Sequence, residues 1–466
     1  MPALHVKDVY DPVAEAVLHR YRAHDRTLPI SAPTSRLGPV RLRPSTVQPG
    51  EYCHTFSDGC SLSASPPRVS STPFPYIGLL SLAGAIFVSV TSEFLPTGLL
   101  LAMADDLGVS RSTAGYLVTI FAGTVVVATT PLAAVTQRVS RKSLLVVVLL
   151  VIAVANILAA IAPTYAVLVA ARVLGGLAHG LFWAVVAAYA AHLVPAHQLG
   201  KAVSITAGGG TAAFVLGVPV GTAIGTALGW RTAFTIIGIV VLVLVVVIVK
   251  FLPPVEHRVE RAAGEERVPL RRDPSMKAVL LLCAVILIVL TGQNLFYTYI
   301  APWLTDVSTF PVEGVALVLF LYGGAGIIGL LIAGYATDRF PRNAFVAVVL
   351  VVMLAVLTLA VGSSSSVVVL IAVTVWGAAF GAIPAMLQTR MLRTASVRIR
   401  DLSAALQTTA FNIGIAGGAL FGGLLLDSVG LAILPFVLII MLGAGLALSL
   451  ITDTAAGRRE RRRLRP

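Results

Sequence analysis

The chain has 466 residues, of which 57% are hydrophobic and 12% are charged, and its formal net charge is +13. With a mean hydropathy of +0.92, it cannot be an ordinary water-soluble globular protein, in which about 25% of residues are charged. Most basic residues stand in short segments between apolar runs, a pattern that indicates membrane topology and not nucleic-acid binding. The three cysteines provide neither a disulfide framework nor a metal-binding spacing.

The first region, residues 1–72, is polar and rich in Pro, Ser and Arg. It lacks the apolar central run of a secretory signal. We interpret it as a disordered cytoplasmic extension. The alternative is a start codon assigned too far upstream, because no second Met occurs before Met103.

Twelve apolar stretches follow, each long enough to cross a hydrocarbon core of about 30 Å as a helix. Helices are expected because the pattern is one of long apolar runs and not of short alternating strands. The fold class is therefore an all-α membrane protein. The predicted spans lie near residues 75–102, 112–134, 143–162, 165–190, 201–224, 231–252, 276–303, 313–336, 344–361, 366–389, 402–426 and 430–451.

A charged, Pro-containing stretch, residues 253–275, separates these spans into two groups of six. It is too polar for lipid and too short for a domain, so we predict a cytoplasmic linker. The predicted organisation is a first six-helix half over 73–252, a second over 276–451, and a basic cytoplasmic tail over 452–466.

Lys and Arg mark alternate loops, and we expect those loops and both termini to face the cytoplasm. The loop residues are Arg138, Arg141, Lys142, Lys201, Arg339, Arg342, Arg393, Arg398 and Arg400.

A fixed offset of 201 positions relates features of the two halves, which predicts a duplicated six-helix unit with parallel halves. Secondary transporters use this plan and place their site between the halves. The matched pairs are Arg138 and Arg339, Arg141 and Arg342, Gly217 and Gly418, Gly221 and Gly422, and Glu93 and Asn294.

Four motifs carry a family resemblance: Gly334-Tyr-Ala-Thr-Asp338-Arg339-Phe-Pro-Arg342, Arg172-Val-Leu-Gly-Gly176, Gly217-Val-Pro219-Val-Gly221 and Thr91-Ser-Glu93-Phe-Leu-Pro96. Together they resemble the major facilitator superfamily, within it the drug and sugar proton antiporters with twelve spans. The first-half copy of the loop motif, Ala133 to Lys142, has Gln137 where the family usually has Asp.

Three further strings, Ala178-His-Gly-Leu-Phe-Trp183, Gly323-Gly-Ala-Gly-Ile-Ile-Gly329 and Phe411-Asn-Ile-Gly414, are similar to bacterial sugar exporters of the arabinose type and to chloramphenicol exporters. The resemblance implies a monomer in a bacterial cell membrane that exports a sugar or a drug by alternating access. Protons would be the coupling ion and no cofactor or nucleic acid would take part.

Two alternatives stay open beside proton-driven export. A proton-coupled importer differs in direction, which leaves little trace in sequence. A membrane-embedded enzyme is a remote alternative, because the acids and histidines are scattered instead of clustered. Direct use of ATP is not expected, since the chain has no Gly-x-x-x-x-Gly-Lys-Ser/Thr string.

Glu93 is the acidic residue that lies well inside a predicted span, and we predict that it couples transport to protons. Burial favours the protonated carboxyl and a nearby arginine favours the carboxylate, so a site that alternates between these environments can bind and release a proton. Arg172 is the matching cation at a similar depth. Alternatively, Glu93 is a structural buried acid and Arg172 is a packing anchor bonded to backbone carbonyls.

Solute-binding residues are predicted on the fourth, seventh, tenth and eleventh spans. His179 and Trp183 share one helix face with Arg172; a neutral histidine satisfied by a neighbouring helix is the alternative. Neutral amides and a phenol suit a hydroxylated or amphiphilic solute, and aromatic rings can stack on it, although such rings more often only pack. These further residues are Gln293, Asn294, Tyr297, Trp376, Phe380 and Asn412.

Gating is predicted at charged loop residues and at the flexible fifth span. Asp338, Arg339 and Arg342, with Arg138 and Arg141 in the first half, are expected to latch helices at the cytoplasmic side; mere topogenic charge is the alternative. Glycines permit close helix approach and Pro permits a bend. In the fifth span these residues are Gly217, Pro219 and Gly221.

Overall fold

The computed structural model describes residues 74–136, 139–194, 198–253, 273–308 and 310–463. The predicted extension 1–72, most of the predicted linker 253–275 and Arg138 lie outside the described residues. For Asp338 and Arg342 only the backbone is described.

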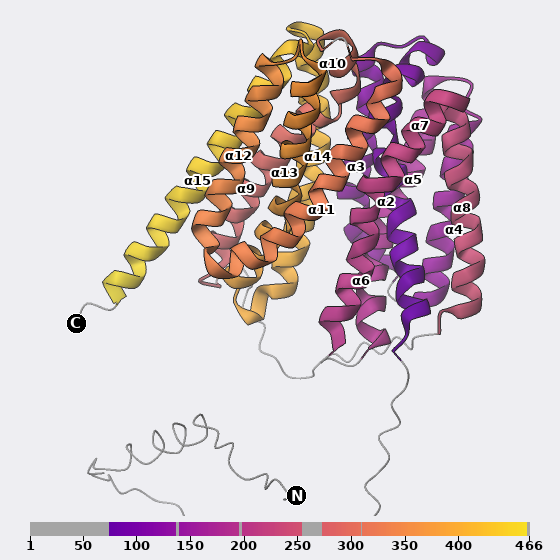
Figure 1. Cartoon of the computed structure of the whole chain (residues 1–466). Coiled ribbons are helices and arrows are strands. Elements are labelled where there is room, and N and C mark those ends of the chain that lie inside the picture. Colours follow the sequence, from indigo (N-terminus) through magenta and orange to yellow (C-terminus); the bar gives the residue numbers. More distant parts are fainter. Residues whose placement is uncertain (1–73, 137–138, 195–197, 254–272, 309, 464–466) are drawn as a thin grey trace, which may run out of the picture. The chain divides into compact units, whose positions relative to one another are not determined.

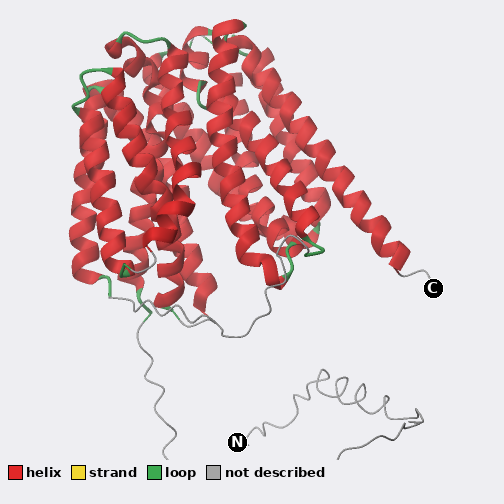
Figure 2. Ribbon diagram, turned by 180° about the vertical axis from the view of Figure 1, so that it is seen from behind, coloured by secondary structure: helices red, strands yellow, loops and turns green. Residues whose placement is uncertain are grey.

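Every regular element in this part of the chain is a helix, as Figure 2 shows. The first half contains α2 (Tyr76–Leu107), α3 (Arg111–Val135), α4 (Arg141–Ala160), α5 (Tyr165–Leu193), α6 (Leu199–Ala212), the π-helix η3 (Ala213–Gly217), α7 (Val218–Leu228) and α8 (Trp230–Phe251). The second half contains α9 (Met276–Tyr297), α10 (Ile300–Asp306), α11 (Val315–Arg339), α12 (Pro341–Val361), α13 (Ser366–Thr394), α14 (Arg400–Ser428) and α15 (Leu434–Arg463).

Twelve helical segments within the described residues are long and apolar enough to cross a membrane, which confirms the all-α class and the twelve predicted spans. The seventh span differs from its prediction, because it breaks after Tyr297 instead of running to 303. Pro302 explains the break: its ring clashes with the carbonyl four residues earlier, at Thr298, and it has no N–H to offer. The last helix runs past the predicted end at 451 to Arg463.

The fifth span is interrupted by η3, which ends two residues before Pro219. A proline displaces the carbonyl four residues before it, here that of Val215, and a π-turn is one way a helix absorbs this displacement. The bend places Phe214 beside the second half, where its backbone carbonyl closely approaches Gly323 of α11.

Glycines allow the same close packing in both halves. The fifth span packs on α2, with Gly217 against the side chain of Thr91. In the second half, a Cβ on Gly418 of α14 would lie 2.6 Å from the carbonyl oxygen of Thr291 on α9. The duplication predicted from the offset of 201 is thus repeated in the packing of the helices.

The two halves contact each other through α3 with α14 and through η3 and α7 with α11. In Figure 1 the ribbons of the halves are drawn together at the end of the bundle that carries α10 and lie further apart at the end that carries the start of α6. We name these the α10 end and the α6 end. At the α10 end, Arg111 of α3 forms an ion pair with Asp306 of α10. Further along α3, about two turns from this end, the Thr119 hydroxyl donates to the Ala416 carbonyl of α14 at 3.1 Å.

Candidate functional site: a cavity between the halves

A cavity of about 430 Å³ lies between the two halves. The first half lines it with Val90, Glu93, Phe94, His179, Trp183 and Phe214. The polar lining of the second half comprises Gln293, Asn294, Tyr297, Tyr322, Gln388, Gln407, Thr408 and Asn412. Its apolar lining comprises Leu290, Phe380, Pro384, Ala404, Phe411 and Ile415.

The cavity extends toward the α6 end. Gln388 and Ala404 belong to its wall, and they lie within two turns of the α6-end termini of α13, which ends at Thr394, and α14, which begins at Arg400. The polar contacts between the halves described above lie nearer the other end, so the halves are held together there while the cavity reaches toward the α6 end.

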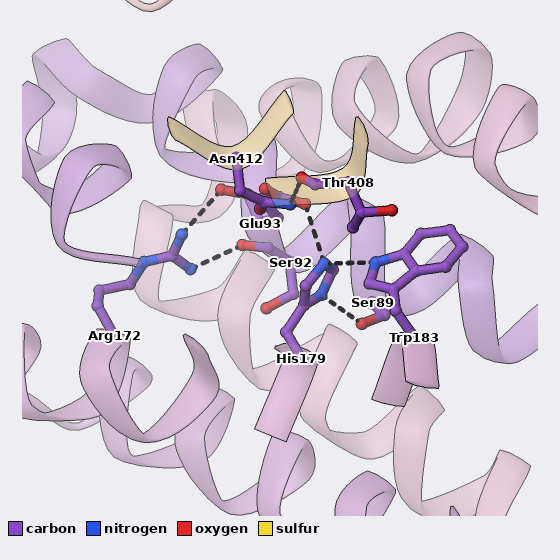
Figure 3. Close-up of polar contacts among 8 residues, drawn as sticks. All are labelled: Ser89, Ser92, Glu93, Arg172, His179, Trp183, Thr408 and Asn412. Atoms are coloured by element: carbon purple, nitrogen blue, oxygen red, sulfur yellow. Dashed lines mark hydrogen bonds and ion pairs between the residues drawn. The ribbon is translucent and has the colours of Figure 1, made fainter. Parts of the chain in front are cut away.

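A histidine and a carboxyl group meet on the first-half wall (Figure 3). His179 Nε2 lies 3.3 Å from Glu93 Oε2, and the two residues are 2% and 5% exposed. The other ring nitrogen, Nδ1, lies 2.8 Å from the Ser89 hydroxyl. Trp183, one turn further along α5, donates its indole N–H to His179 Nε2 at 2.8 Å.

Arg172 ties α5 to α2 through the backbone. Its guanidinium donates to the carbonyl oxygens of Ser92 and Glu93, each at 2.8 Å, and lies 4.1 Å from the centroid of the Phe121 ring. The Ser92 carbonyl needs this donor, because Pro96, four residues later, has no N–H to bond it within the helix. Among the described residues, the carboxyl group of Glu93 lies within 3.3 Å of the His179 ring, whereas Arg172 bonds the Glu93 backbone carbonyl.

The second-half wall is built from neutral groups. The Gln293 amide donates to the Tyr322 hydroxyl at 2.8 Å, and its oxygen accepts the Trp376 indole N–H at 3.1 Å. Asn294 and Asn412 each donate to a carbonyl of their own helix, which leaves their amide oxygens available as acceptors. These groups can form hydrogen bonds with a solute without adding charge.

Of the ten residues predicted to handle protons or solute, eight line the cavity: Glu93, His179, Trp183, Gln293, Asn294, Tyr297, Phe380 and Asn412. Arg172 does not, because its guanidinium is bonded to α2 backbone. Trp376 does not either: it is fully buried, stacks on Phe296 at 5.3 Å between ring centroids, and orients Gln293 from behind the wall.

The sequence interpretation missed the other twelve lining residues, among them Phe94, Phe214, Tyr322, Gln388, Gln407 and Thr408. A signal existed for two of them. Gln388 and Gln407 are polar residues within predicted spans, where polar side chains usually face a cavity or another helix. Tyr322 and Phe214 give no such signal, because aromatic residues in apolar helices are ordinary packing residues.

The predicted gating residues lie in two places. Gly217, Pro219 and Gly221 lie where the fifth span packs on α2. Arg141 begins α4 at the α6 end. Arg339 is exposed at the same end, with its guanidinium 5.7 Å from the Phe340 ring centroid. A latch formed with Asp338, Arg342 and Arg138 stays a prediction.

Among the described lining residues there is no Lys or Arg, and the described part of the chain has no group of three or more His, Cys, Asp or Glu able to hold a metal ion. The ionisable character of the wall comes from Glu93 and His179, with phenols at Tyr297 and Tyr322.

Twelve membrane-spanning helices in two similar halves, with a cavity between them that apolar, aromatic and a few polar side chains line, define a membrane transporter. The sequence profile of the Major Facilitator Superfamily matches residues 82–408 and 282–466, so the chain belongs to this family.

Solved structures show the same fold at low sequence identity. A bacterial homolog of the human lysosomal transporter Spinster, in an inward-facing and occupied conformation, aligns with a TM-score of 0.67 at 14% identity and covers 82% of this chain and 98% of its own. A mutant of the nucleoside transporter NupG aligns with a TM-score of 0.65 at 14% identity, over 81% of this chain and 98% of its own.

Proposed function

We propose that this protein is a proton-coupled secondary transporter that exports a small organic solute, a sugar or a drug, across a bacterial cell membrane by alternating access. The observation that carries the proposal is the division of one cavity between a Glu93–His179 pair on one wall and neutral hydrogen-bonding groups on the other.

The buried carboxyl group supports proton coupling. A carboxylate inside the membrane is costly unless it is protonated, paired or hydrated, and such residues usually mark ion or proton pathways. Glu93 faces a cavity through which water can reach it and has a titratable partner 3.3 Å away. It is therefore placed to take up and release one proton per cycle.

The rest of the wall supports a small uncharged or cationic solute. A volume of about 430 Å³ falls in the range of about 300–1,000 Å³ that holds small organic molecules. Amides and phenols can pair with hydroxyls, and Phe94, Phe214 and Phe380 can cover apolar faces. Because no Lys or Arg is among the described lining residues, an anionic solute would enter without a counter-charge.

Alternating access would be a rocking of one half against the other. We place the α6 end in the cytoplasm, because basic residues gather in its loops; the cavity then extends inward, and the Arg111–Asp306 pair closes the outer side. Export is favoured by the antiporter-like fifth-span motif. A proton-coupled importer with the same site is the second candidate.

The proposal is tested by measuring the accumulation of labelled sugars and antibiotics in cells that express the chain, with and without a protonophore. We expect accumulation of at least one compound to fall, and the protonophore to restore it. A rise in accumulation on expression would establish import instead.

The matched variants are Glu93→Gln and Asp105→Asn. Both replace one carboxyl on α2 with an amide, but Asp105 is exposed at the α10 end whereas Glu93 lines the cavity. Glu93→Gln should abolish protonophore-sensitive export while Asp105→Asn keeps it. Undiminished proton-driven export by a folded Glu93→Gln protein would overturn the role of this carboxyl.

A further inference from the structure

His179 has three partners around a ring that has two nitrogen atoms (Figure 3). Nδ1 lies 2.8 Å from Ser89 Oγ. Nε2 accepts from the Trp183 indole at 2.8 Å and at the same time lies 3.3 Å from Glu93 Oε2. Two groups therefore compete for one nitrogen.

The indole fixes which nitrogen carries hydrogen. An indole N–H is a donor and cannot accept, so Nε2 must present its lone pair to Trp183. The ring is then neutral, with its hydrogen on Nδ1 and donated to Ser89. This assignment follows from donor and acceptor complementarity. A proton on Nε2 would place N–H against N–H, so the indole and a proton exclude each other at this atom.

The position of the proton on Glu93 follows from the same bond. While Nε2 is occupied by Trp183, His179 offers no N–H to the Glu93 carboxyl, and the arrangement suits the protonated acid. If the indole leaves, Nε2 can take the proton from Glu93 Oε2. The product is an imidazolium and a carboxylate joined by a charge-assisted hydrogen bond, with no change in total charge.

Among the described residues, few charged or titratable groups lie near His179 and can influence where the proton resides. The charged or titratable side chain that faces it from α2 is Glu93, and from its own helix Arg172 acts on it at longer range. From α3 it meets the apolar ring of Phe121, at 5.2 Å between ring centroids. Across the cavity stand the phenols of Tyr297 and Tyr322.

Trp183 can contact both a bound solute and the Glu93–His179 pair, because it is half-buried, lines the cavity and bonds His179. We propose that Trp183 is a positioning residue that makes solute and proton bind in alternation. A solute packed against the indole holds it on His179 Nε2, so the Glu93–His179 pair loses the imidazolium form that retains the proton. Without solute the indole still rests on Nε2 with the proton on Glu93, but it is free to turn away, and the pair can then also hold the proton as imidazolium and carboxylate. This inference rests on the proposed antiport.

The test is infrared spectroscopy of the full-length protein in liposomes, which shows a protonated carboxyl group by its C=O stretching band. The Glu93 band is assigned by its loss in Glu93→Gln. In Trp183→Phe no N–H competes for Nε2, so the proton should pass to His179 and most of the Glu93 band should be lost at a pH at which the wild type shows it. The matched control is Trp376→Phe, which removes the indole N–H on Gln293 and should leave the band unchanged.

A second measurement uses the wild type, labelled with ¹⁵N-histidine. Ring-nitrogen NMR signals assigned through His179→Asn should show hydrogen on Nδ1 and a bare Nε2. In the accumulation assay above, Trp183→Phe should lose most of its protonophore-sensitive export.

In the infrared spectra, the inference is overturned by an equal Glu93 band in wild type and Trp183→Phe, or by no Glu93 band in either. In the NMR spectra, hydrogen on Nε2 in the wild type would overturn it. In the accumulation assay, full protonophore-sensitive export by Trp183→Phe would do the same. The spectroscopy needs no transport, so failure of the two hypotheses can be told apart. Export that is insensitive to Glu93→Gln, with the band shift as expected, would reject proton coupling while leaving the competition for Nε2 in place.

Discussion

The two halves share a helical plan and differ in the chemistry at matched positions. With the offset of 201, the ionisable or donor residues at and behind the first-half wall correspond to neutral or apolar residues in the second half. The matched pairs are Glu93 and Asn294, His179 and Phe380, Trp183 and Pro384, and Arg172 and Val373. The first three pairs line the cavity on both sides.

The difference shows that an ionisable carboxyl group in this cavity needs partner residues nearby, and that among the described residues only the first half provides them. Glu93 lies beside His179, and Arg172 secures the backbone of the helix that carries it. Phe380 and Val373, at the matched positions, provide neither a titratable nitrogen nor a donor. Proton chemistry is therefore expected in the first half and neutral recognition of solute in the second.

The largest effect should come from moving the acid to the other half. In Glu93→Asn combined with Asn294→Glu, the new carboxyl has no His or Arg from its own half, and an unpartnered charge in a membrane helix costs about 2.5–3.5 kcal/mol. We expect no protonophore-sensitive export and a lower melting temperature. Restored coupling in the double variant would show that either half can hold the proton.

Arg172→Lys tests the backbone anchor that the second half lacks. A lysine cannot bond the Ser92 and Glu93 carbonyls together as the planar guanidinium does, and one lost hydrogen bond to a charged group costs about 1.5–3 kcal/mol. We expect a corresponding fall in thermal stability in detergent. Val375→Leu, on the exposed face of α13, should change stability far less; equal losses would mean that the bonds to α2 are not what matters.

The glycine contacts should be equivalent in the two halves, in contrast to the cavity residues. Gly217→Ala and Gly418→Ala would press on Thr91 and on the Thr291 carbonyl, and overpacking costs about 1–3 kcal/mol. Gly208→Ala is the control, because nothing lies within 4 Å of its added Cβ. If only one of the two variants lowered the melting temperature, the glycine contacts would not be equivalent in the two halves.

The ion pair between the halves should have a smaller effect. Arg111 and Asp306 are more than a third exposed, and such pairs contribute about 0.2–1 kcal/mol. Arg111→Ala should therefore shift the population away from the closed α10 end by at most about fivefold. Spin-label distances between positions 228 and 429, both exposed at this end, measure the shift. The charge-reversed double variant Arg111→Asp with Asp306→Arg keeps an opposite-charge pair and should restore the wild-type population.

The smallest effect is expected at the α6 end of the second half. Hydrogen bonds from Ser275 and then Ser396 lower the pKa of Asp273. A lowered pKa in the folded protein gives stability that is present above the unfolded value and lost as the pH falls through the folded one. Asp273→Asn should therefore be slightly less stable than wild type at about pH 7, and the difference should shrink as the pH falls below about 4. Unfolding midpoints measure this, with Glu313→Gln as control; a difference that persists in acid would contradict it.

The helix ends and the break in the seventh span show which features of the helices hydropathy could predict and which it could not. The sequence predicted twelve spans because lipid requires about 20 apolar residues per crossing. It predicted the seventh span as one helix, although Pro302 holds the physical reason for its interruption. The continuation of α15 to Arg463 was missed because a basic segment gives no hydropathy signal, whereas its backbone continues a helix already formed.

By itself, the sequence determined the number of spans, the duplication and the cost of the acid at Glu93, because hydrophobicity and charge act on each residue wherever its neighbours lie. Tertiary structure alone decided the partners. Arg172 bonds a carbonyl freed by a proline 76 positions earlier in the chain, and Trp376 lies behind Gln293 instead of facing the cavity. Hydrogen bonds depend on distance and direction, and these are set when separate helices pack.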